Sequence, residues 1–301
     1  MSKITGINGR ILYNSRGSKT IEVDVISDES FIGRVCAPSG ASVGKYEAVS
    51  FPNNNPEESL TLLKNNSEKF IGSDPTDLKS VHEIIRSIDD TENYAKIGGA
   101  CAFAITIAVT ESAAKLQNIP LYKIINPSND LKFPFPIGNI LGGGAHAGPG
   151  TPDIQEILVA STGAKTMHDA IDMNLQVHKE LRNVIQKTDP TFTNGRGDEG
   201  GWAPKYDNEK ALEISVTAIE NLGFTLGKEV SLGVDFASST QWDEQRGRYI
   251  YDRAGFENDP GEQIDFTAGI IEKYKLAYAE DAVHEEAFDD MAELTKRFPH
   301  T

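Results

Sequence analysis

The sequence predicts two successive domains, an α+β domain with a three-stranded antiparallel sheet and helices, followed by an α/β domain built from βα units. Three observations support this division. Short β-rich runs open the chain, a Pro- and Asn-rich segment lies at residues 126–136, and apolar runs alternate with amphipathic helical patterns beyond it. We therefore expect one domain over residues 1–126 and a second over residues 127–301.

The first domain begins with three predicted strands, at residues 4–13, 20–26 and 31–36. They are rich in β-branched and apolar residues, and turn-forming segments at 14–17 and 27–30 separate them. Such short connections favour antiparallel pairing. Two helices are then predicted, one over 78–88 from the helical spacing of Leu78, Val81 and Ile85, and one over about 100–116.

Beyond the linker, three short apolar runs alternate with three helical patterns. We expect strands at 154–159, 230–236 and 276–279, helices at about 166–186, 208–222 and 263–274, and a last helix around 290–297. Alternation of this kind predicts βα units and a mainly parallel sheet, whose ligands gather at the carboxyl ends of the strands.

The composition excludes several classes of function. The 301 residues include 29 Lys and Arg against 45 Asp and Glu, which gives a net charge of −16. Nucleic acid and anionic membrane surfaces attract basic faces, so neither is an expected partner. The amino terminus does not resemble a secretory signal, and the apolar run at 100–109 is far shorter than the ~20 residues of a membrane span. Cys36 and Cys101 lack metal-site spacing, so we expect reduced thiols, a cytoplasmic location and no membrane insertion.

Acidic residues follow or end several of the predicted strands. Asp235 and Glu280 do so, as does Glu156 after Ile154 and Gln155, and an acidic loop flexed by glycines occupies residues 197–201. Carboxylates that converge at one edge of a sheet repel one another unless a cation neutralises them, and oxygen-only ligands favour Mg²⁺ over zinc. From the residues alone, helix-capping or surface acids fit Asp235 and Glu280 about equally well.

Six motifs in order give the chain a resemblance to a known family. They occupy residues 14–23 together with the loop 38–48, then 142–148, 153–156, 197–204, 234–239 and 278–281. In this order and composition they are similar to the motifs of enolases, along essentially the whole chain. The Gly-Asp-Glu-Gly-Gly element at 197–201 separates enolases from the related racemases and muconate-type enzymes.

The resemblance implies an enolase-type (TIM-like) barrel and the reversible Mg²⁺-dependent dehydration of 2-phosphoglycerate to phosphoenolpyruvate in glycolysis and gluconeogenesis. It also implies a role for each matching residue. Asp235 and Glu280 are expected to bind one Mg²⁺, and Ser39 to meet a second. Glu199 is expected to be the general acid, assisted by Glu156. The expected substrate contacts are His146, Gln155, Gly40 and Ala41.

Two histidines, His146 and His178, can be assigned a functional or a structural role from their sequence context. A structural role for His146, in a glycine-rich loop, is about as probable as a functional one before the resemblance is considered. His178 lies in register with Leu181 and Ile185 on the apolar side of a predicted helix, and we expect it to be structural.

The sequence also departs from the enolase pattern. Asn14 replaces an Asp, and Val43 replaces a Thr in the loop that closes over the site, so loop closure is the step most affected. The 175 residues from Pro127 to Thr301 compare with the ~250 of a complete eight-stranded barrel, so we expect an incomplete barrel that lacks its last strands. The lysine base, the third metal aspartate and the phosphate-binding Arg-Ser pair are therefore expected beyond Thr301.

We accordingly predict that a polypeptide ending at Thr301 shows no dehydration of 2-phosphoglycerate by itself. The expected reason is the missing base and phosphate ligands. Mg²⁺-dependent turnover by a preparation whose intact mass ends at Thr301 would contradict this.

Two other functions compete with the enzymatic one. A non-catalytic enolase homologue would act through protein interactions, and a metal protein with another substrate would use the same carboxylates. An in-frame continuation of the gene past codon 301 favours the enzyme, whereas a stop codon favours the first alternative. By resemblance we also expect a homo-oligomer, a dimer or an octamer, with display at the cell surface as a further property of the family.

Overall fold

The computed structural model describes residues 2–40, 43–128 and 130–301, which form two compact units. Unit 1 comprises Met1–Leu131 and unit 2 comprises Lys132–Thr301, so the division falls within the Pro- and Asn-rich segment. Each unit has its own cluster of buried apolar side chains.

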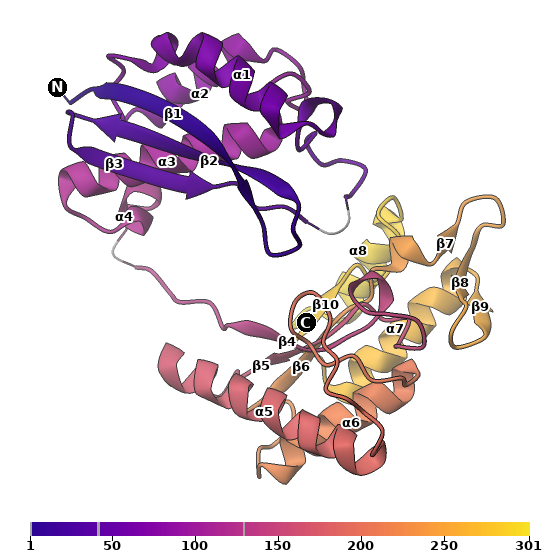
Figure 1. Cartoon of the computed structure of the whole chain (residues 1–301). Helices are drawn as coiled ribbons and strands as arrows, with labels where there is room; N and C mark the ends of the chain where they lie inside the picture. Colours follow the sequence, from indigo (N-terminus) through magenta and orange to yellow (C-terminus); the bar gives the residue numbers. More distant parts are fainter. Residues whose placement is uncertain (1, 41–42, 129) are drawn as a thin grey trace. The chain divides into compact units, whose positions relative to one another are not determined.

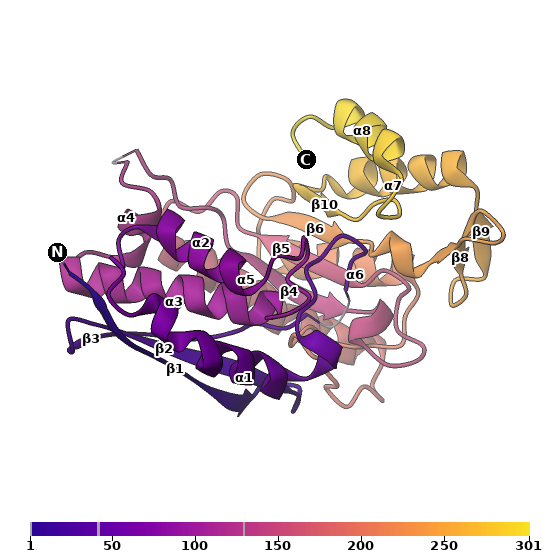
Figure 2. The same ribbon diagram turned by 90° about the horizontal axis from the view of Figure 1, so that it is seen from above.

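Unit 1 contains the three-stranded antiparallel sheet that the sequence predicts. Its strands follow the order β1 (Ile4–Tyr13), β2 (Lys19–Ser27) and β3 (Phe31–Cys36). One face carries ion pairs between basic side chains of β1 and β3 and the carboxylates of Glu22 and Asp24. The other face is covered by helices (Figures 1 and 2), which are α1 (Pro56–Asn66), α2 (Leu78–Ile88) and α3 (Gly99–Gln117), with α4 (Leu121–Ile125) following them.

Helix α3 forms the centre of the unit 1 core. It packs closely on β3, since a Cβ built on Gly33 would lie only 1.8 Å from the carbonyl oxygen of Ala108. Its length and composition alone would allow it to cross a membrane, but 61% of the apolar stretch of this helix is buried inside the unit. Packing against β2 and β3 accounts for that apolar composition.

Most of the long helices begin where a side-chain oxygen accepts a hydrogen bond from a backbone N–H of the first turn. This satisfies a donor that has no partner inside the helix. The helices of unit 2 are α5 (Met167–Thr188), α6 (Asn208–Asn221), α7 (Pro260–Tyr274) and α8 (Phe288–Arg297). The capping residues in both units are Asn55, Asp77, Thr166, Asp207 and Asp259.

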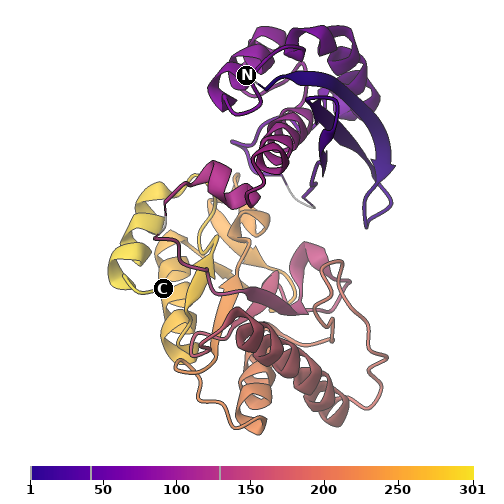
Figure 3. The same cartoon turned by 90° about the vertical axis from the view of Figure 1, so that its left-hand side faces the viewer.

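Unit 2 is built on a four-stranded sheet in the order β10-β6-β5-β4. The strands are β4 (Ile137–Gly142), β5 (Glu156–Ala160), β6 (Ser231–Asp235) and β10 (Tyr278–Glu280). Helices α5 and α6 pack on each other and on β5, and α7 packs on α8 (Figure 3). A second, smaller sheet contains β7 (Trp242–Asp243), β8 (Arg248–Tyr251) and β9 (Phe256–Asn258), which the sequence patterns do not predict.

The expectation of a mainly parallel sheet is wrong for these four strands. Of the three pairings in this sheet, only that of β6 with β10 is parallel, whereas β4 pairs antiparallel with β5, and β5 antiparallel with β6. The reason is the connection between β5 and β6, which contains two successive helices, α5 and α6. One helix returns the chain to the starting edge of the sheet, but a second helix carries it back again, so β6 runs opposite to β5.

Candidate functional site

Three carboxylates occupy one row across the unit 2 sheet. Glu156 of β5 pairs with Asp235 of β6, and Asp235 pairs in turn with Glu280 of β10. Directly paired residues on neighbouring strands project from the same face, so the three side chains share one side of the sheet. The sequence interpretation of Glu156 as the end of a strand is wrong, because it is the first residue of β5. Antiparallel pairing brings this first residue opposite the last residue of β6.

Asp235 is held in place on both carboxylate oxygens. Its Oδ2 accepts a hydrogen bond from Gln155 Nε2 at 2.9 Å, and its Oδ1 accepts one from the backbone N–H of Ala237, also at 2.9 Å. Its side chain is buried, and burial raises its pKa to about 6, with a further contribution from the charges of Glu280 and Asp281. The site therefore favours a neutralising partner for this carboxylate.

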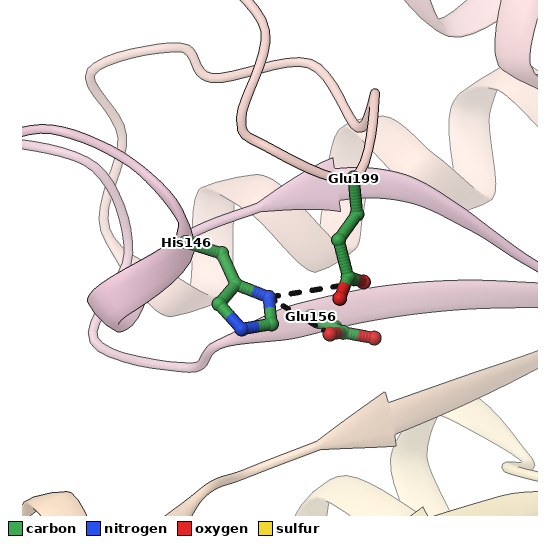
Figure 4. Close-up of side chains that lie close together, drawn as sticks. All are labelled: His146, Glu156 and Glu199. Carbon is green, nitrogen blue, oxygen red and sulfur yellow. Dashed lines mark ion pairs between the residues drawn. The ribbon is translucent and has the colours of Figure 1, made fainter. Parts of the chain in front are cut away.

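His146, Glu156 and Glu199 converge beside this row (Figure 4). The Nδ1 atom of His146 lies 2.9 Å from Glu156 Oε1 and 3.8 Å from Glu199 Oε2. His146 comes from a short 3₁₀ helix after β4, Gly144–His146, and Glu199 from the acidic loop. One ligand atom from each residue falls within 4.8 Å of the others, so the three could also hold a metal ion.

Glu156 is the carboxyl whose proton affinity the site changes most. Burial, the hydrogen bond and charge repulsion with Glu199, and the charges of Asp235 and Glu280 together raise its pKa to about 8. Two carboxyl groups this close share a proton more readily than they both ionise. Glu156 thus joins the carboxylate row to the cluster of His146 and Glu199.

The acidic loop is fixed at its base by β4 and by α5. The backbone N–H of Trp202 donates to the carbonyl of Ile140, and the Trp202 indole stacks on the His178 ring with ring centroids 4.8 Å apart. His178 Nε2 donates to the carbonyl of Gly200 at 3.0 Å. His178 therefore supports the loop that carries Glu199, which is a structural role.

Two polar residues near the site were not singled out from the sequence. Asn139 Nδ2 of β4 donates to Glu199 Oε2 at 3.4 Å, and the Tyr278 hydroxyl donates to Glu280 Oε2 at 2.9 Å. Burial and the charge of Glu280 raise the pKa of Tyr278 to about 12. The available signal for Asn139 was a single amide within an otherwise apolar strand.

Ser39 and Gly40 lie in unit 1, in the exposed segment after β3. Ser39 Oγ accepts a hydrogen bond from Asn14 Nδ2 at 2.7 Å, and its carbonyl accepts one from Arg16 Nη1 at 3.1 Å. Ala41, the other predicted contact in this loop, lies outside the described residues. Val43 is 71% exposed.

The donor set of the row fits a hard divalent cation. Asp235 and Glu280 offer only oxygen atoms, and the pKa of Asp235 is raised by burial and by the neighbouring charges of Glu280 and Asp281. Gln155 Oε1 is buried with no hydrogen-bond partner among the described residues. Carboxylate and amide oxygens are ligands that Mg²⁺ accepts in proteins, whereas zinc sites favour sulfur and nitrogen.

Comparison with known proteins places both units in one family. Residues 4–125 match the model for the enolase N-terminal domain, and residues 130–300 match the model for the enolase C-terminal TIM barrel domain. The described strands and helices of unit 2 thus form part of such a barrel. Enolases are phosphopyruvate hydratases, which are lyases.

Archaeal enolases are among the curated relatives. The enolase of Methanosphaera stadtmanae is 42% identical over 297 residues, which cover 98% of this chain and 72% of the relative. That of Methanothermobacter thermautotrophicus is 42% identical and that of Pyrobaculum aerophilum 37% identical, with 98% and 96% of this chain covered and 71% and 70% of the relatives. With both domain models and these relatives matched in order along its length, the chain belongs to the enolase family.

Proposed function

We propose that this protein takes part in the Mg²⁺-dependent, reversible dehydration of 2-phosphoglycerate to phosphoenolpyruvate. The observation that supports this most directly is the row of Glu156, Asp235 and Glu280 beside the cluster of His146 and Glu199. The row can hold a cation, and the cluster can hold and deliver a proton. A dehydration that leaves negative charge next to a carboxylate requires both.

Each residue has a proposed role. Asp235 and Glu280 hold one Mg²⁺, and Ser39 meets a second. Bound Mg²⁺ would supply the positive charge that stabilises negative charge developing on the substrate.

Glu199 protonates the departing hydroxyl, and Glu156 shares a proton with it, in keeping with their hydrogen bond and the raised pKa of Glu156. His146, Gln155, Gly40 and Ala41 contact the substrate.

The setting of the reaction is proposed on the same basis. We place the protein in the cytoplasm, in glycolysis and gluconeogenesis, as a homo-oligomer that is a dimer or an octamer. No nucleic-acid partner is proposed, in line with the net charge of −16.

The test is to express the product of the complete gene and follow the ultraviolet absorbance of phosphoenolpyruvate formed from 2-phosphoglycerate. Turnover is expected with Mg²⁺ and should disappear when EDTA is added, returning with excess Mg²⁺. If a folded product binds Mg²⁺ and yields no phosphoenolpyruvate, the catalytic proposal is wrong and a non-catalytic role through protein interactions is favoured.

A further inference from the structure

Arg253 lies in the turn between β8 and β9 and donates to four acceptors on one distant segment. Its Nη1 atom donates to the carbonyl of Thr151 at 3.0 Å, to the Thr151 hydroxyl at 2.8 Å and to the carbonyl of Pro152 at 2.8 Å. Its Nη2 atom donates to the carbonyl of Gly144 at 3.2 Å. One guanidinium therefore joins Gly144 to Thr151 and Pro152, which lie seven and eight residues further along the chain.

The backbone of the turn adds two further hydrogen bonds to the same segment. The carboxylate of Asp153 is buried and accepts hydrogen bonds from the backbone N–H groups of Arg253 and Ala254, at 3.2 and 3.0 Å. The turn thus donates from side chain and backbone alike, and the segment 144–153 accepts at every contact. Hydrogen bonds with one charged partner are about twice as strong as neutral ones, and all of these have one.

The segment held in this way carries the site. It begins at the 3₁₀ helix that presents His146 and leads directly into Gln155 and Glu156. Its two ends are also joined by backbone hydrogen bonds, from Gly143 N–H to the carbonyl of Gln155 at 2.8 Å and from Gly144 N–H to the carbonyl of Pro152 at 2.9 Å. Arg253 also bonds to both ends of this segment, so it helps to fix the position at which the chain enters β5.

The base of the loop tolerates little displacement. A Cβ built on Gly143 would lie 2.3 Å from the carbonyl oxygen of Ile154, and Gly144 has a φ of +49°. A shift at this base is passed to His146, which is only two residues from Gly144. The 2.9 Å separation of His146 Nδ1 from Glu156 Oε1 depends on the relative position of the two ends.

We propose that Arg253 is a positioning residue for the site, which acts by holding the 144–153 segment so that His146 stays opposite Glu156. The effect on loop geometry is independent of the proposed function, whereas the effect on turnover rests on it. A lysine cannot substitute fully, because one ammonium replaces two nitrogens fixed in a plane.

The experiment compares Arg253→Ala and Arg253→Lys with Arg246→Ala in the product of the complete gene. Arg246 is a matched control, because it lies in the same small sheet region and its guanidinium pairs with Glu257 instead of the loop. Two experiments are made: NMR for the resonance of the His146 Cε1–H group at one pH, and steady-state kinetics for kcat and KM with 2-phosphoglycerate.

Arg253→Ala is expected to shift the His146 resonance and to lower kcat by about 10- to 100-fold, since small misplacements of reacting groups cost that much. KM should change by less than about threefold. Arg253→Lys should lie between Arg253→Ala and wild type, and millimolar guanidinium should restore part of the kcat of Arg253→Ala. Arg246→Ala should match wild type in both measurements.

An unchanged His146 resonance in Arg253→Ala overturns the proposal, as does a loss of kcat that Arg253→Lys and guanidinium leave unrepaired. A wild-type protein without turnover contradicts the proposed function alone, and the resonance then still decides whether Arg253 positions the loop.

Discussion

Replacing Glu199 by glutamine is expected to lower kcat by about 10²- to 10⁴-fold, the range in which general acid catalysis contributes. Glutamine keeps the size of the side chain and can still contact Asn139 Nδ2, which lies 3.4 Å from Glu199 Oε2. Its amide has no acidic proton to deliver to a departing hydroxyl. The measurement is steady-state turnover of 2-phosphoglycerate by the product of the complete gene, with Mg²⁺ affinity measured in parallel.

Mg²⁺ affinity should change little in Glu199→Gln, since Asp235 and Glu280 are the proposed ligands. The side chain of Glu199 is 38% exposed, so the free energy of unfolding should also be retained. Glu220→Gln, at an exposed position of α6, is the matched control and should behave as wild type. A kcat for Glu199→Gln within about threefold of wild type would remove Glu199 from the role of acid.

Replacing Asp235 by asparagine should move stability and metal affinity in opposite directions. The pKa of Asp235 is raised from 3.8 to about 6, so without metal the folded protein binds more protons than the unfolded chain between these values. Folding stability must then fall as the pH rises through this window and remain reduced above it. A neutral amide avoids that loss, so the metal-free variant should gain about 1 to 3 kcal/mol at pH 8.

The same substitution removes a charged ligand, and Mg²⁺ affinity should fall by roughly 100-fold or more, beyond the effect of losing a residue that only orients a ligand. Denaturant unfolding at pH 5 and pH 8, with EDTA and with Mg²⁺, measures both effects. Asp172→Asn, on the exposed side of α5, is the control. A metal-free variant that is less stable than wild type at pH 8 would show that Asp235 is not under electrostatic stress.

The sequence predicts the sheet of unit 1 well because its signals are local. Turn residues at 14–17 and 27–30 separate β-branched runs, and these turns alone determine which strands pair. Helix α2 is predicted for the same reason, from Leu78, Val81 and Ile85 at helical spacing, and in the structure Asp77 caps it.

The direction of β5 could not be predicted in this way. The sequence patterns do predict two helices between these strands, at 166–186 and 208–222. The edge of the sheet at which the chain re-enters depends on how α5 and α6 pack, which is a property of the tertiary structure. Glu156 was therefore recognised as a site residue but assigned to the wrong end of its strand.

Arg253 gave no sequence signal at all. A single arginine in a turn is compatible with a solvated surface, and its four acceptors are about one hundred residues away along the chain. Backbone carbonyls carry no residue identity, so no motif reports such a contact.

The row of Glu156, Asp235 and Glu280 also restricts how this sequence can change over evolutionary time. Side chains alternate between the two faces of a strand, so inserting or deleting one residue within β5, β6 or β10 would turn a carboxylate toward the opposite face. The change would also turn apolar neighbours such as Ile157 and Val234, which are buried, toward the face that now carries the carboxylates. Related sequences should therefore differ in these three strands by substitution and not by length. Insertions should be found in the segments that connect the strands.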